Sequence, residues 1–112
     1  MDKLHQLLGL AARAGKLVSG EEQVLRAIRS GSAFIVLLSE DAASNAAKKI
    51  SDKCNYYRVP LSKAGTRREL GRAIGKGERV VIAVTDPGFS KTMRKWIRVT
   101  DGGDQFDENT RI

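Results

Sequence analysis

Apolar positions along the chain follow two spacings, one typical of a helix face and the other of a short buried strand. Near the start, apolar side chains recur every three or four residues and stop at Gly15, which predicts a first helix. A similar pattern near the end predicts an amphipathic final helix. The apolar members are Leu4, Leu7, Leu8, Ala11 and Ala12 in the first helix, and Phe89, Met93, Trp96 and Ile97 in the last.

Polar residues mark where the helices begin. Ser19 with Glu22, and Thr66 with Glu69, each form a capping-box pattern in which the two residues exchange hydrogen bonds. Asp41 is expected to cap a third helix, and Asp86-Pro87 is a typical helix start. The predicted helices cover about residues 2–14, 20–30, 42–54 and 66–74, with a final one beginning at Asp86.

Short runs of branched apolar residues separate these helices and read as strands. The runs over residues 34–38 and 79–84 carry no alternating polar positions, which predicts strands buried on both faces. Extended segments are also expected over residues 16–18 and over residues 56–59, where Pro60 ends the strand. Strands that alternate with helices predict an α/β layered fold with helices on both faces of a small sheet.

Charge is unevenly placed along the 112 residues, which are enough for one domain. The chain has 20 Lys and Arg against 13 Asp and Glu, a net charge of +7. Residues 101–112 carry −3 of this, so residues 1–100 carry +10. We therefore expect one basic domain over residues 1–100 followed by an acidic tail. Such a charge favours a polyanionic partner, and a solvated basic surface is the alternative.

Several function classes are disfavoured. One cysteine and one histidine exclude an internal disulfide and a Cys/His-rich metal site. The turn Gly75-Lys76-Gly77 precedes a strand, whereas a dinucleotide-binding loop follows one. No nucleophile, base and orienting group fall together, and Cys54 reads as a small buried hydrophobe. We expect no enzyme activity, no cofactor and no metal.

The longest apolar runs are too short to span a membrane, and the first helix does not resemble a signal peptide. These features predict a cytoplasmic protein with no membrane partner, and the absence of a strong exposed apolar patch predicts a monomer.

Gln23 and Arg26 are the strongest candidates for nucleic-acid contacts. They are three residues apart on one helix, so an amide and a guanidinium share a face near its N-terminus and suit the edges of a guanine. An ordinary polar helix face is the alternative. Candidate phosphate contacts are Lys16, Lys63, Arg67 and Arg68. Aromatic residues are only 5%, and Phe34, Phe89 and Trp96 read as structural, so stacking on bases is not the favoured mode.

Several segments carry a family resemblance over about residues 3–98. The stretches 7–11, 14–22, 37–45, 52–57, 69–76 and 84–86, among them Ala14-Gly15-Lys16-Leu17-Val18-Ser19-Gly20-Glu21-Glu22, are similar to bacterial YlxQ-type proteins. These belong to the superfamily of ribosomal proteins that bind RNA kink-turns, the L-seven-A-e and L-thirty-e type.

The resemblance implies a three-layer α/β/α sandwich on a mixed four-stranded sheet, and binding to a sharply bent duplex with tandem sheared G·A pairs. In the family motif, Gly20, Gln23 and Arg26 would face the G·A pairs. Glu22 stands where many members have Asn or Lys. A second family contact surface precedes the last strand. The charged loop from Lys76 to Arg79 takes its place here, and we expect Lys76 and Arg79 to contact phosphates. Glu40 would flank the same groove.

The leading hypothesis is a non-enzymatic protein that binds a kink-turn or a related bent RNA in translation. Gln23 and Arg26 would specify the RNA, while Lys16, Lys63, Arg67 and Arg68 would hold phosphates. One alternative is a charge-driven binder of structured RNA without kink-turn preference. Another is a module that binds ribosomal or RNA-processing proteins.

Overall fold

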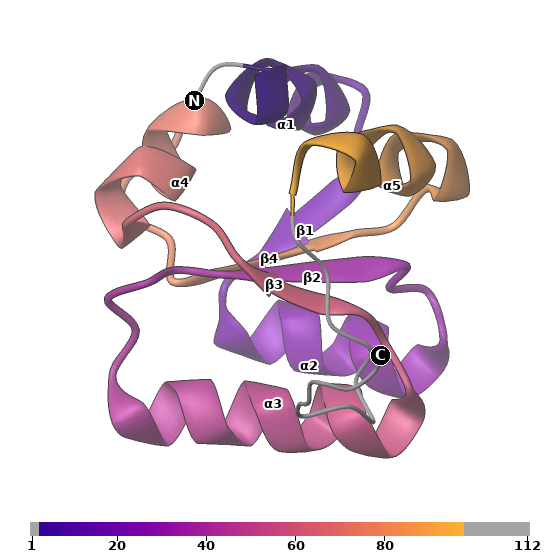
Figure 1. Ribbon diagram of the computed structural model, residues 1–112, viewed down its shortest axis with the longest axis vertical. Coiled ribbons are helices and arrows are strands. Elements are labelled where there is room, and N and C mark those ends of the chain that lie inside the picture. The colour runs from indigo at the N-terminus through magenta and orange to yellow at the C-terminus, as the bar shows by residue number, and fades with distance from the viewer. Residues whose placement is uncertain (1–2, 98–112) are drawn as a thin grey trace.

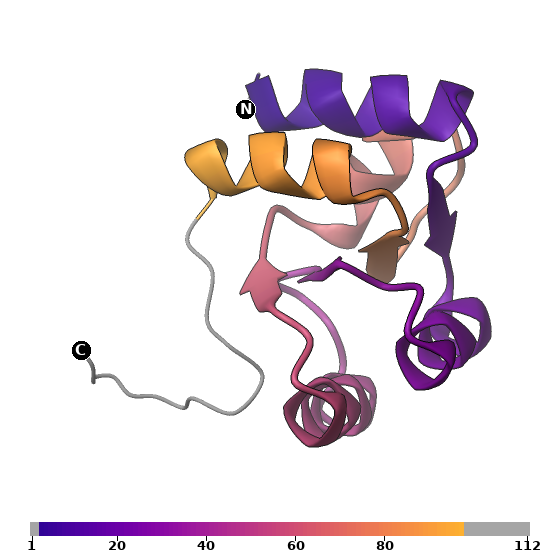
Figure 2. The same cartoon turned by 90° about the vertical axis from the view of Figure 1, so that its right-hand side faces the viewer.

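The computed structural model describes residues 3–97, which form a sheet covered by helices on both faces (Figure 1). One face carries α1 (Lys3–Arg13), α4 (Arg67–Ala73) and α5 (Pro87–Met93), and the other carries α2 (Glu21–Ser30) and α3 (Ser44–Tyr57). The view turned by 90° separates the same layers (Figure 2). The predicted three-layer α/β/α sandwich is therefore confirmed.

The sheet is mixed and has four strands in the order β1 (Leu17–Ser19), β4 (Val81–Val84), β2 (Ile35–Leu38) and β3 (Leu61–Lys63). β2 and β3 run parallel, whereas β4 is antiparallel to both β1 and β2. This register brings the ends of β1, β2 and β3 to the same end of the sheet as the start of β4. The loops at that end form one continuous rim, here called the sheet-end rim.

Two apolar cores lie on opposite faces of the sheet, because successive strand residues point to opposite sides. In β2, Ile35 and Leu37 pack beneath α1, α4 and α5, while Val36 and Leu38 pack against α2 and α3. Every residue of β2 and β4 is buried, which confirms the burial expected on both faces. The largest fully buried side chains outside the strands are Leu8, Val24, Ile28, Ile50, Leu70 and Met93.

Two of the predicted helix starts are confirmed. The hydroxyl of Thr66 accepts from the Glu69 amide at 3.1 Å, and the Glu69 carboxylate accepts from the Thr66 amide at 2.9 Å. At the start of α5, the carboxylate of Asp86 accepts from the Phe89 amide at 2.9 Å. α5 passes into a 3-10 turn, η1 (Arg94–Trp96), at the end of the described residues.

The strand predicted over residues 56–59 is wrong. α3 continues to Tyr57 and ends at Arg58, which has a left-handed backbone conformation. The strand begins after the proline instead, at Leu61, and the Pro60 carbonyl accepts from the Val36 amide at 2.9 Å. A proline that lacks an amide hydrogen can precede a strand without losing a bond of the ladder. Between residues 3 and 97, no helix is long and apolar enough to cross a membrane.

Candidate nucleic-acid interface

The N-terminus of α2 lies at the sheet-end rim without a side-chain cap. Gly20 has φ 94° and ψ 148°, a conformation that L side chains rarely adopt, and its amide donates to the Val81 carbonyl at 3.0 Å. The capping box predicted at Ser19 is wrong, because the Ser19 hydroxyl accepts from Arg79 Nε at 3.0 Å. The first amides of α2 therefore have no side-chain acceptor, and they favour an anion.

Gln23 and Arg26 are both exposed on the first turns of α2, while Val24, Ala27 and Ile28 bury the opposite face. Arg26 lies 3.4 Å from the carboxylate of Glu22, an exposed pair one turn apart. Both side chains are thus presented to solvent near the start of α2. The pairing with Glu22 partly neutralises the guanidinium.

The fold brings Gln23 beside the loop that connects α4 with β4. A hollow of about 340 Å³ is lined by Ser19, Gln23, Lys76 and Arg79, together with apolar residues beneath them. Lys76 also borders a second hollow of about 490 Å³, which Arg68 and Arg72 line from α4. We call this the α2–α4 surface, comprising Gln23, Arg26, Arg68, Arg72, Lys76 and Arg79.

Arg79 holds the α4–β4 loop in place. Its guanidinium donates to the carbonyls of Gly77 at 3.3 Å and Glu78 at 2.9 Å, besides its bond to Ser19. Three hydrogen bonds from one planar group join the loop to the end of β1. Arg79 was predicted to contact phosphate, and the structure gives it a positioning role within the chain.

Close packing of two glycines fixes the same loop from below. A Cβ atom on Gly71, a buried residue of α4, would lie 1.9 Å from the carbonyl oxygen of Gly77. Gly71 therefore allows the loop to lie directly on α4. This contact sets the position of Lys76 relative to α2.

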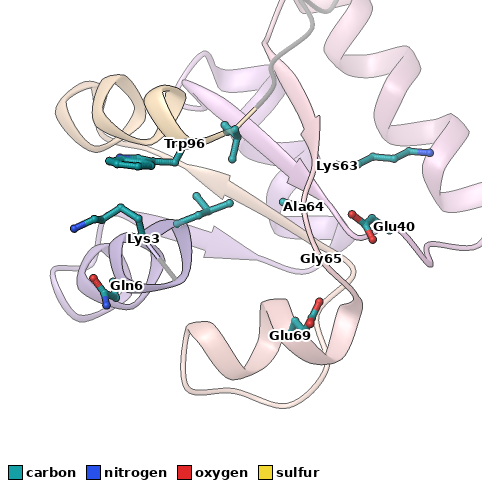
Figure 3. Close-up of a pocket in the computed structure, with 10 residues that line it drawn as sticks. Lys3, Gln6, Glu40, Lys63, Ala64, Gly65, Glu69 and Trp96 are labelled. Carbon is teal, nitrogen blue, oxygen red and sulfur yellow. The ribbon is translucent and has the colours of Figure 1, made fainter. Parts of the chain in front are cut away.

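Glu40 and Lys63 also lie at the sheet-end rim, but they line a different cavity. This cavity, the Trp96 cleft, has a volume of about 750 Å³ and opens between α1, η1 and the ends of β3 and β2 (Figure 3). Its lining residues are Lys3, Leu4, Gln6, Glu40, Lys63, Ala64, Gly65, Glu69, Trp96 and Ile97. Trp96 was predicted to be structural, and 52% of it is exposed.

Asp41 does not cap α3 as predicted, because it binds the start of α4. Its carboxylate accepts from the Arg67 amide at 2.9 Å, and the Arg67 guanidinium donates to the Asp41 carbonyl at 2.6 Å. Desolvation raises the pKa of Asp41, but the hydrogen bond from the Arg67 amide, further hydrogen bonds and the charge of Arg67 together outweigh it, so the net pKa is lowered. The guanidinium of Arg67, a predicted phosphate contact, is thus already engaged.

Lys16 precedes the three-residue strand β1, whereas Gly20 follows it. The next residue, Leu17, lines the hollow that also contains Gln23 and Lys76. Sequence reasoning also missed Arg72. The sequence did indicate Arg72 as a candidate phosphate contact, because Arg68 and Arg72 are four residues apart and share one face of α4.

Among residues 3–97, no group of three or more side chains that could bind a metal ion lies together. Cys54 is fully buried, as predicted, and burial raises the pKa of its thiol to about 12. A thiol with that pKa stays protonated at neutral pH and is a poor nucleophile.

A model of the family described as "Ribosomal protein L7Ae/L30e/S12e/Gadd45 family" matches residues 2–94. The chain belongs to this family. The match extends from α1 through α5 and includes both elements of the α2–α4 surface. The resemblance drawn from the sequence segments is confirmed.

Similar proteins support the assignment. The "RNA-binding protein YlxQ" of Bacillus subtilis (strain 168) is 60% identical over 87 residues, which cover 78% of this chain and 87% of that protein. A solved structure of a protein of unknown function from Bacillus halodurans C is 50% identical, with a TM-score of 0.82 over 85% of this chain and 96% of that one. The Giardia lamblia 15.5kD RNA binding protein shares the fold, with a TM-score of 0.74 and 20% identity over 83% and 80% of the two chains.

Proposed function

We propose that this protein is a non-enzymatic RNA-binding protein whose α2–α4 surface recognises a kink-turn or a similarly bent RNA. The observation that carries the proposal is the single hollow lined by Gln23, Lys76 and Arg79, beside the uncapped N-terminus of α2. It combines base-reading and phosphate-binding groups at one place. The RNA-binding name of the Bacillus subtilis relative supports the RNA-binding part of this proposal.

The residues of the α2–α4 surface have different roles, which follow from the chemistry of their side chains. Gln23 and Arg26 contact base edges, since an amide and a guanidinium can each make two hydrogen bonds to a base. Lys76, Arg68 and Arg72 bind phosphates of the adjoining strand, because their charges follow the line of the two hollows. Arg79 acts through the loop that it positions.

The protein stabilises the bent RNA by binding it in preference to extended forms. A free RNA samples both shapes, and a protein with differential affinity shifts the population toward the shape it binds. A 100-fold preference corresponds to about 2.7 kcal/mol. We also propose that the protein acts as a cytoplasmic monomer with ribosomal or RNA-processing proteins as further partners.

The test is a titration at physiological salt against a kink-turn RNA and a control RNA in which Watson–Crick pairs replace the two G·A pairs. We expect the kink-turn RNA to bind at least tenfold more tightly. Equal and strongly salt-dependent binding to both RNAs would show a charge-driven binder without kink-turn preference. Size-exclusion chromatography of the complex checks the monomeric state.

Substituting Glu22→Gln should strengthen RNA binding. The change removes an anion beside the RNA surface and releases Arg26 from its exposed ion pair. Exposed pairs contribute about 0.2–1 kcal/mol, so we expect affinity to rise up to roughly fivefold. The matched control is Glu21→Gln, because Glu21 pairs with Lys49 of α3 at 2.9 Å and faces away from Arg26. If the affinity of Glu22→Gln for RNA is unchanged, the RNA does not bind beside Glu22 and Arg26.

The double substitution Arg68→Ala and Arg72→Ala should weaken binding of every RNA to a similar degree. Phosphate contacts carry no sequence information, and each one lost should reduce the slope of log affinity against log salt by about one. Titrations from low to high salt measure this slope for the kink-turn and control RNAs. A loss confined to the kink-turn RNA would contradict the assignment of these two residues to phosphates.

A further inference from the structure

The Trp96 cleft has the size and lining of a small-ligand site. Its volume of about 750 Å³ falls within the range of roughly 300–1,000 Å³ that is typical of such sites. Its apolar surface comes from Leu4, Ala64 and Ile97, and the half-exposed ring of Trp96 forms one wall (Figure 3). A large aromatic ring that is half exposed beside apolar side chains presents apolar surface that a ligand can cover.

We propose that the Trp96 cleft holds one unpaired nucleotide that adjoins the bent duplex on the α2–α4 surface, with its base stacked on Trp96. The proposal rests on the proposed RNA-binding function. Every base has a π-face, so an exposed aromatic ring binds unpaired nucleotides with little regard to sequence.

Polar groups also line the cleft. Gln6 of α1 and Glu40 after β2 contribute amide and carboxylate oxygens, which can accept from the exocyclic amino groups of adenine, cytosine and guanine. Glu40 lies at the opposite end of the cleft from Trp96 (Figure 3), so the base on Trp96 is held by stacking and apolar contact.

Two lysines at the cleft supply the positive charge that phosphates near it require. Lys3 Nζ lies over the Trp96 ring, 5.8 Å from its centroid. Lys63 leaves the end of β3 and extends away from the cleft on the side of Glu40 (Figure 3). Phosphates stay in solvent while a base inserts, so cations are needed at the rim rather than at the floor.

The cleft and the α2–α4 surface share the rigid sheet-end rim. Three backbone hydrogen bonds cross it, from Gly20 to Val81 at 3.0 Å, from Ser39 to Val80 at 2.7 Å and from Glu40 to Gly65 at 2.7 Å. The sheet places β1 three strand spacings from β3, which is about 14 Å. Both places lie at this end of the sheet, so one RNA molecule can contact both.

The experiment uses Trp96 as its own reporter, because it is the only tryptophan of the chain. A blunt kink-turn RNA is compared with the same RNA extended by four unpaired adenosines at either end, and with abasic versions of those extensions. RNA binding is followed by the anisotropy of a label on the RNA, and stacking by quenching of Trp96 fluorescence. We expect an adenosine extension at one end to quench Trp96 and to tighten binding about fivefold or more, and the abasic versions to do neither.

Variants separate stacking from a structural effect. Trp96→Ala should abolish the gain from the extension and leave affinity for the blunt RNA unchanged, while Trp96→Phe should keep part of the gain. Tyr56→Ala is the matched control, since Tyr56 is 78% exposed near the end of α3.

The two proposals fail in different ways. If the blunt RNA binds with kink-turn preference but no extension changes affinity or Trp96 fluorescence, the nucleotide site is wrong and the proposed function stands. If adenosine and abasic extensions tighten binding equally, the contacts are to phosphates alone and the site is again wrong. If no RNA binds with kink-turn preference, the proposed function itself fails.

Discussion

Replacing Gln23 and Arg26 together by alanine should reduce affinity for a kink-turn RNA by roughly 30-fold or more, since each paired base contact contributes about 1–3 kcal/mol. Both side chains are exposed, and the buried face of α2 stays intact, so the variant should fold normally. The measurement is the ratio of affinities for the kink-turn RNA and for the control without G·A pairs. That ratio should fall toward one.

The control for this double variant is Arg29→Ala. Arg29 is exposed in the last turn of α2, so its removal takes the same charge from the same helix away from the sheet-end rim. We expect it to weaken both RNAs slightly and to leave their ratio unchanged. If Arg29→Ala lowers the ratio as far as the double variant does, Gln23 and Arg26 read no bases.

Substituting Gly71→Ala should destabilise the fold and weaken RNA binding together. The added methyl group would lie 1.9 Å from the Gly77 oxygen and 2.6 Å from its carbonyl carbon, which are backbone atoms that cannot rotate away. Overpacking of this kind costs about 1–3 kcal/mol, although alanine recovers up to roughly 1 kcal/mol of helix propensity. The net loss should lower the Tm by several degrees, because about 1 kcal/mol corresponds to roughly 4–8 °C in a domain of this size.

RNA affinity should fall in Gly71→Ala even at temperatures where the protein is fully folded. A displaced loop would move Lys76 and break the bonds from Arg79 to the Gly77 and Glu78 carbonyls. Gly9→Ala is a suitable control, since its Cβ would lie 3.1 Å from the Ala73 oxygen, a contact that a small shift relieves. Unchanged stability and affinity in Gly71→Ala would show that the loop is not held by α4.

Sequence-based predictions of helix caps were correct where the hydrogen-bond partner lies within a few residues of the capping side chain. The capping box of Thr66 and Glu69 formed as predicted, and so did the cap at Asp86, because each bond spans three residues. The unbroken apolar runs likewise predicted strands buried on both faces. Burial in those strands follows from the absence of polar positions, whatever the neighbouring elements are.

Two predicted helix caps were wrong, because a residue distant in the sequence binds the capping side chain instead. Ser19 was expected to cap α2, yet it binds Arg79, which is 60 residues away. Asp41 was expected to cap α3, yet it binds Arg67, which is 26 residues away. A capping side chain is satisfied by whichever donor the fold presents, and local spacing cannot show a donor from another element.

By itself, the sequence determined the layered α/β class, the two-sided burial of the central strands, the excess of basic residues and the exposed pair Gln23 and Arg26. These depend on periodicity, composition and contacts within one helix. Only the tertiary structure decided that Lys76 and Arg79 lie beside Gln23, that Gly71 supports their loop and that Trp96 stands open in a cleft. Such neighbours come from strand order and from the packing of separate elements, which no local pattern records.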